Sequence, residues 1–163
     1  MNKTRVMSLL LALILLLSPL SAVFAQDAEP IAVERISGSN RYATAIEISE
    51  AGFDSSTHAV IASGADFPDA LARAQLAGYL DAPLLIVHPA LGVTDEIRAE
   101  LSRLGVTDIY LLGGDAALPE AIETGLEANY EVTRLSGSNR VRTSEEIVSE
   151  IMRLYGEKTR TYY

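Results

Sequence analysis

The chain has 163 residues, with 13 lysines and arginines against 22 aspartates and glutamates, which gives a net charge of −9. This length suits a single domain, and the hydrophobic share of 48% is too high for a disordered protein. The absence of cysteine excludes a disulfide framework and a thiolate metal site, and the acidic balance argues against non-specific nucleic-acid binding, which depends on basic surface.

Residues 1–25 have the three regions of a secretory signal peptide. Lys3 and Arg5 form a basic start, a leucine-rich run follows, and small residues precede the cleavage point after Ala25. An uncleaved membrane anchor needs about 20 continuous apolar residues, and this run is about half as long. We therefore expect a secreted protein with no membrane span after cleavage. Losing the two basic residues leaves a net charge of −11.

Short strands and helices alternate along the rest of the chain. The sequence predicts strands over 33–36, 59–62, 83–87, 108–112 and 131–135, and helices over 41–51, 68–80, 95–104, 119–126 and 141–155. Glycines follow several of these helices, as is typical of helix C-termini. This alternation predicts an α/β domain with a mainly parallel sheet and flanking helices. For the last helix we expect one apolar face, made of Ile147, Val148, Ile151, Met152 and Tyr155.

One block of sequence occurs twice. Residues 35–45 read RISGSNRYATA, and 99 positions later residues 134–144 read RLSGSNRVRTS. A match at this offset indicates that a whole module is repeated. We expect a module over 26–130 and the start of a second, incomplete repeat over 131–163. The offset predicts a further strand near 158–161, which favours a fragment; the alternative is that these last elements dock back onto the first module.

A known family shares this ordered set of motifs. The motif residues are Arg35, Gly38, Arg41, Tyr42 and Thr44, then Ser63-Gly64, Phe67, Asp69-Ala70-Leu71, Pro83–Ile86 and Gly113-Gly114. They resemble the cell-wall-binding repeat family (type 2) of secreted and surface proteins, mainly of Gram-positive bacteria. The resemblance implies toprim-like modules in tandem, commonly three around a pseudo-threefold. It also implies non-covalent anchoring to anionic polymers of the wall, often beside a separate hydrolase or adhesion domain.

The arginines of the two copies are the candidate ligand-binding groups. In each copy a Ser-Gly-Ser-Asn loop leads into a helix, and backbone N–H groups, hydroxyls and guanidinium groups at a helix start suit an anion. The predicted polymer-binding residues are Arg35, Ser37, Asn40, Arg41, Arg134, Ser136, Asn139 and Arg140. The alternative is that these arginines hold acidic residues of the same or the next module and fix module packing. Because the chain is acidic, polymer binding must rest on local arginine geometry or bridging cations.

The apolar strand Leu84, Leu85, Ile86 is most simply core, although the family associates it with polymer binding, which would require a partly exposed module edge. Ser63, His88 and Asp66 could imitate a hydrolase triad, but no Gly-x-Ser-x-Gly elbow surrounds the serine. Two lone histidines do not make a transition-metal site. We therefore predict no catalytic residue, metal or cofactor, and a non-catalytic module that anchors a secreted protein to the wall. The alternatives are the N-terminal part of an amidase-type wall hydrolase, with its catalytic domain absent here, or a self-assembling surface-layer module.

Overall fold

The computed structural model describes residues 33–65 and 70–160 of the chain. The predicted signal peptide, the motif residues Asp66, Phe67 and Asp69, and the end of the strand expected near 158–161 lie outside the described residues. In the part that is described, no helix is both long enough and apolar enough to cross a membrane.

Four strands form one parallel sheet in the order β2-β1-β3-β4. They are β1 (His58–Ser63), β2 (Leu84–Val87), β3 (Asp108–Leu112) and β4 (Glu131–Leu135). The helices are α2 (Arg41–Gly52), α3 (Ala70–Leu80), α4 (Asp95–Leu104), α5 (Glu120–Glu127) and α6 (Arg140–Arg160). The predicted α/β class and parallel sheet are therefore confirmed.

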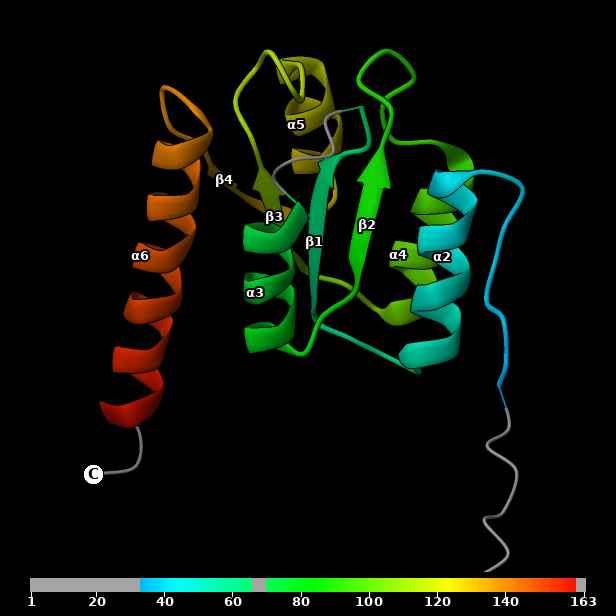
Figure 1. The fold of residues 1–163 in the computed structure, drawn as a ribbon, viewed down its shortest axis with the longest axis horizontal. Helices are drawn as coiled ribbons and strands as arrows, with labels where there is room; N and C mark the ends of the chain where they lie inside the picture. Colours follow the sequence, from blue (N-terminus) through cyan, green and yellow to red (C-terminus); the bar gives the residue numbers. More distant parts are fainter. Residues whose placement is uncertain (1–32, 66–69, 161–163) are drawn as a thin grey trace, which may run out of the picture. The chain divides into compact units, whose positions relative to one another are not determined.

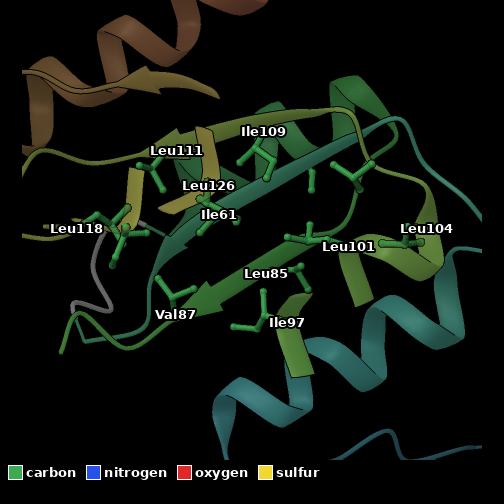
Figure 2. Close-up of a cluster of buried hydrophobic side chains, with 13 residues drawn as sticks. Ile61, Leu85, Val87, Ile97, Leu101, Leu104, Ile109, Leu111, Leu118 and Leu126 are labelled. Atoms are coloured by element: carbon green, nitrogen blue, oxygen red, sulfur yellow. The ribbon is translucent and has the colours of Figure 1, made fainter. Parts of the chain in front are cut away.

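Helices cover both faces of the sheet (Figure 1). On one face, β-strand side chains such as Ile61 and Leu111 pack with Leu101 of α4 and Leu126 of α5 (Figure 2). The partly buried Ile46 of α2 packs against this cluster. The opposite face packs against α3 and α6 through a second apolar cluster, made of Val60, Leu76, Ala77, Tyr110, Leu112, Leu135 and Ile147. Each large side chain buried in this way contributes about 1.5–3 kcal/mol to folding.

A buried carboxylate joins α2 to α4. Glu100 is 2% exposed, accepts a hydrogen bond from the Ser49 hydroxyl, and receives Arg103 Nε at 2.7 Å and Arg103 Nη2 at 2.8 Å. Arg103 Nη2 also donates to the Phe53 carbonyl oxygen at 2.9 Å, just after α2. The hydrogen bonds from Arg103, with a smaller one from Ser49, hold the pKa of Glu100 below its usual value despite its burial.

We expect this carboxylate to make stability depend on pH. Because the folded-state pKa is lowered, the stabilisation is complete above the unfolded pKa of about 4.5 and is lost as the pH falls below it. Glu100→Gln should lower stability at neutral pH by about 1–3 kcal/mol and flatten the acid-side slope. Thermal unfolding followed by circular dichroism from about pH 7 to pH 3 measures both effects. An acid slope in the variant as steep as in the parent would contradict this assignment.

The structure corrects two predicted strands. Residues 33–38 lie in no strand, because the β3 edge that such a strand would extend is already occupied by β4, its counterpart from the second copy. The strand expected near 158–161 is helical as far as Arg160. Arg153 supports this longer helix by pairing with Glu150 and Glu157, which lie one turn away on either side.

The structure also corrects the buried face of α6. Ile147 is 1% exposed and Ile151 is partly buried, as expected, but Val148, Met152 and Tyr155 are 49%, 68% and 62% exposed. The buried stripe instead includes Thr143 and Leu154, because the contacts of α6 with α3 and β4 decide which side faces inward. In the described structure β4 pairs with β3, and α6 packs on α3 and β4.

Candidate functional site

The loop of the first copy is held together by its own side chains. Asn40 caps α2, since its Oδ1 accepts the N–H groups of Tyr42 at 2.9 Å and Ala43 at 3.0 Å. The Gly38 N–H donates to Thr44 Oγ1 at 3.0 Å, and a Cβ on Gly38 would lie 2.6 Å from the Ala43 backbone. The Asn40 carboxamide oxygen is therefore committed to the helix start.

The second copy repeats these bonds. The Gly137 N–H donates to Thr143 Oγ1 at 3.0 Å, and Asn139 Oδ1 accepts the Arg142 N–H at 3.1 Å. A Cβ on Gly137 would lie 2.3 Å from Cβ of Arg142. Each copy therefore has the same local structure, in which the Ser-Gly-Ser-Asn loop leads into a helix capped by its asparagine.

Two of the predicted arginines lie at helix starts and remain exposed. Arg41, the first residue of α2, donates from Nη1 to the Gly64 carbonyl oxygen at 2.8 Å, just beyond the end of β1. Arg140, the first residue of α6, is exposed and forms no ion pair with any described residue. The hydroxyl-bearing residues Ser37 and Ser136, four positions before these arginines in the sequence, are also exposed.

Arg134 has a different environment. Its side chain is 12% exposed, and its Nε donates to Glu123 Oε2 at 2.7 Å. Its Nη1 donates to the carbonyl oxygens of Gly113 at 2.8 Å and Leu118 at 3.0 Å, while Nη2 is buried without a partner in the described structure. Arg134 thus fastens β4 to the loop after β3 and to α5. Its counterpart Arg35 is exposed and forms no ion pair with any described residue.

A pocket of about 370 Å³ opens beside the loop of the first copy. It lies between the start of α2 and the segment that joins β2 to α4, and its lining includes Asn40, Tyr42, His88 and Glu96. The rings of Tyr42 and His88 pack edge to face, with centroids 5.9 Å apart. A hydrogen bond from Thr94 lowers the pKa of Glu96. No motif connects residues 88–96 with the first copy, so the sequence alone does not predict this pocket.

The apolar strand β2 lies at the edge of the sheet. Leu85 is fully buried in the core, while Leu84 and Ile86 on the other face are only partly buried. At this edge of the sheet, Leu84 and Ile86 are therefore partly exposed, whereas Leu85 belongs to the buried core.

The residues that could imitate a hydrolase make local contacts in the structure. Ser63 Oγ accepts the Ala65 N–H at 3.3 Å, and His88 Nδ1 accepts the Ala90 N–H at 3.1 Å. Asp66, the third member, lies outside the described residues. Within the described ranges, no group of three or more histidines and carboxylates is placed to hold a metal ion.

The family model of cell wall binding domain 2 (CWB2) matches residues 35–123, more than half of the chain. The chain belongs to the CWB2 family. The resemblance seen in its motifs is thereby confirmed, and the match begins at Arg35, the first residue of the repeated block.

Relatives of this CWB2 chain include two proteins of Bacillus subtilis (strain 168). It is 30% identical over 116 residues to N-acetylmuramoyl-L-alanine amidase LytC, covering 71% of this chain and 23% of the amidase. It is 28% identical over 118 residues to a protein named amidase enhancer, covering 72% of this chain and 17% of that protein. The CWB2 chain thus spans less than a quarter of the length of either relative.

Two solved structures from Clostridium difficile are similar in fold. Cwp6 superposes with a TM-score of 0.66 at 29% identity, covering 76% of this chain and 21% of Cwp6. Cwp8 superposes with a TM-score of 0.63 at 25% identity, covering 71% of this chain and 19% of Cwp8. These similarities agree with the parallel α/β sheet described above.

Proposed function

We propose that this CWB2 chain is a non-catalytic module that holds a secreted protein on the wall of a Gram-positive bacterium by binding an anionic wall polymer. Family membership and the Bacillus and Clostridium relatives support the location. The observation that carries the polymer proposal is Arg41, an exposed guanidinium fixed at the N-terminus of α2.

The geometry at Arg41 suits a phosphate or carboxylate. Its bond to the Gly64 carbonyl oxygen uses Nη1 and leaves the other guanidinium nitrogens for charge-assisted contacts. The positive end of the α2 dipole adds attraction over the first turn. The net charge of −11 expected for the mature chain repels an anionic polymer, but salt screens repulsion beyond about 8 Å, so local contacts decide binding.

The remaining predicted residues divide into two roles. Arg140, Arg35, Ser37 and Ser136 are exposed and join Arg41 as proposed polymer contacts. Asn40 and Asn139 cap helices. We assign them, with Arg134, to holding the structure that presents the exposed groups.

Arg41→Gln is expected to weaken retention of the mature chain on purified Gram-positive walls several-fold, because it removes the charge at the helix start. Sedimentation with walls before and after extraction of their phosphate-containing polymers measures this effect. Arg153→Gln, an arginine paired with Glu150 and Glu157 further along α6, is the matched control and should bind like the parent.

Three outcomes would contradict the proposal. Equal sedimentation with stripped and unstripped walls would exclude the anionic polymer as the ligand. Equal retention of the two variants would exclude Arg41 as a polymer contact. Clearing of a wall suspension by the purified chain would show a hydrolase instead of a binding module. Thermal unfolding of Arg41→Gln should accompany the assay, since loss of the bond to Gly64 also affects stability.

A further inference from the structure

A second pocket, of about 300 Å³, lies between the segment that joins β2 to α4 and the start of α5. Leu91 and Gly92 line it as well as the pocket beside Tyr42. Both segments follow a strand at its carboxyl end (Figure 1). Parallel α/β sheets commonly bind ligands at this end. We call it the Arg98 pocket, after the arginine of α4 that contributes to its lining.

The walls of the Arg98 pocket are apolar and conformationally restricted. Pro89 and Pro119 line it from the two segments, and each proline ring fixes its own φ. Gly92 has a φ of 67°, and a Cβ there would lie 3.8 Å from Cγ1 of Ile122, which is 5% exposed. The loop backbone therefore packs closely on α5, and the pocket is formed without a ligand.

Arg98 is the one charged residue among the described residues that line this pocket, and no other side chain of its lining is polar. Its side chain is partly buried and forms no ion pair and no hydrogen bond with any described residue. Its Nη2 lies 3.9 Å from the position that a Cβ on Gly125 would take. The guanidinium is therefore placed beside α5 with its donors unused.

This environment differs from that of other arginines in the described ranges. Arg35 and Arg140 also form no ion pair there, but both are exposed to water. Arg134 is partly buried like Arg98, but it binds the carboxylate of Glu123 at 2.7 Å. A partly buried cation without an acceptor has lost water contacts and gained none from the protein. Arg98 therefore has the burial of a paired arginine and lacks the anion.

We propose that the Arg98 pocket binds a carboxylate that carries a small apolar group, such as the C-terminus of a peptide that ends in alanine. The guanidinium can donate to both carboxylate oxygens, and Val93 and Ile122 offer apolar surface to the attached group. Arg98 supplies one positive charge and the other lining side chains supply no donor, which favours a carboxylate over a more highly charged, strongly hydrated phosphate. Arg41 does not line this pocket, so the inference is independent of the proposed polymer binding.

Titration of the isotope-labelled mature chain with N-acetyl-alanyl-alanine, followed by NMR, tests the proposal. The expected result is a saturable shift of the amide signals of residues 89–98 and 119–125. The C-terminal amide of the same peptide should bind at least about tenfold more weakly, because it has the same shape without the charge. The last alanine is used in its D and L forms, because wall peptides end in D-alanine and proteins in L-residues. The tighter form identifies the source of the carboxylate.

Two variants separate the charge from the shape of the pocket. Arg98→Gln removes the charge, and Ala121→Leu places a larger side chain at an exposed position of the lining without changing any charge. Both should weaken binding at least about tenfold. Arg153→Gln, on α6, is the control and should bind like the parent.

Three results would overturn the proposal. They are equal binding of the acid and the amide, binding by Arg98→Gln as tight as by the parent, and no saturable shift in the pocket at about 10 mM peptide. Thermal unfolding of Arg98→Gln is measured alongside and should match the parent, because Arg98 makes no ion pair or side-chain hydrogen bond with any described residue.

Discussion

Replacing Arg134 with alanine is expected to lower the free energy of unfolding of the mature chain by about 3–5 kcal/mol. Its guanidinium is nearly buried and bonds to Glu123 and to the carbonyl oxygens of Gly113 and Leu118. Removing it leaves a partly buried carboxylate without its cation and two carbonyl oxygens without donors. Each uncompensated polar group inside a protein costs about 1–3 kcal/mol.

Arg140→Ala is the matched control, because Arg140 belongs to the same copy but is exposed and forms no ion pair with any described residue. Surface substitutions of this kind stay within about 0.5 kcal/mol. Urea denaturation of both variants measures the difference. A double-mutant cycle with Glu123→Gln then isolates the coupling of the ion pair. An Arg134→Ala variant as stable as the Arg140→Ala variant would show that Arg134 does not fasten β4.

The α/β class and most elements could be predicted because their signals are local. The sequence predicts the strand Asp108–Leu112 and the helix Asp95–Leu104 with the bounds that the structure shows. Gly105 ends that helix with a φ of 75°, the left-handed conformation that favours glycine. Such features depend on neighbouring residues, so one sequence is enough to recognise them.

Features decided by long-range packing could not be predicted in this way. Residues 33–36 and 131–135 have similar sequences, and the sequence predicts a strand for both. The β3 edge accepts only one neighbouring strand, and in this chain that strand is β4. Likewise α6 has apolar residues on two sides, and its contacts with α3 and β4 determine that Ile147 is buried and Val148 is exposed. A repeated sequence predicts a repeated local structure, but the environment of each copy can be read only from the three-dimensional structure.

In the candidate site, too, the sequence predicts which residues share a motif, but long-range packing decides which of them are exposed. Sequence identity placed Arg35 and Arg134 in one role, yet Arg134 lies against Glu123 and Arg35 is exposed. The pocket beside Tyr42 depends on the segment that follows β2, whose residues carry no motif. The exposure of each matched residue in the two copies therefore has to be compared before a role in ligand binding is assigned to it.

Ile147→Ala is expected to destabilise the mature chain by about 2–5 kcal/mol, whereas Ile48→Ala should change its stability by no more than about 0.5 kcal/mol. Ile147 fills the space between α6, α3 and β4, so truncation leaves a cavity, while Ile48 is 53% exposed. Alanine also has the higher helix propensity, which offsets part of any loss at position 48. Urea denaturation of the two variants gives both values.

The two substitutions share residue type, helix position and flanking motif, so their difference measures the surroundings alone. A loss at Ile48 as large as at Ile147 would mean that α2 already buries that side in solution, through association of the chain with itself. Dependence of the loss on protein concentration would identify such association, because only an intermolecular contact weakens on dilution. A loss of stability at Ile48 that does not change on dilution would instead mean that Ile48 is in contact with another part of the same chain. Such a result would contradict the exposure of Ile48 in the structure.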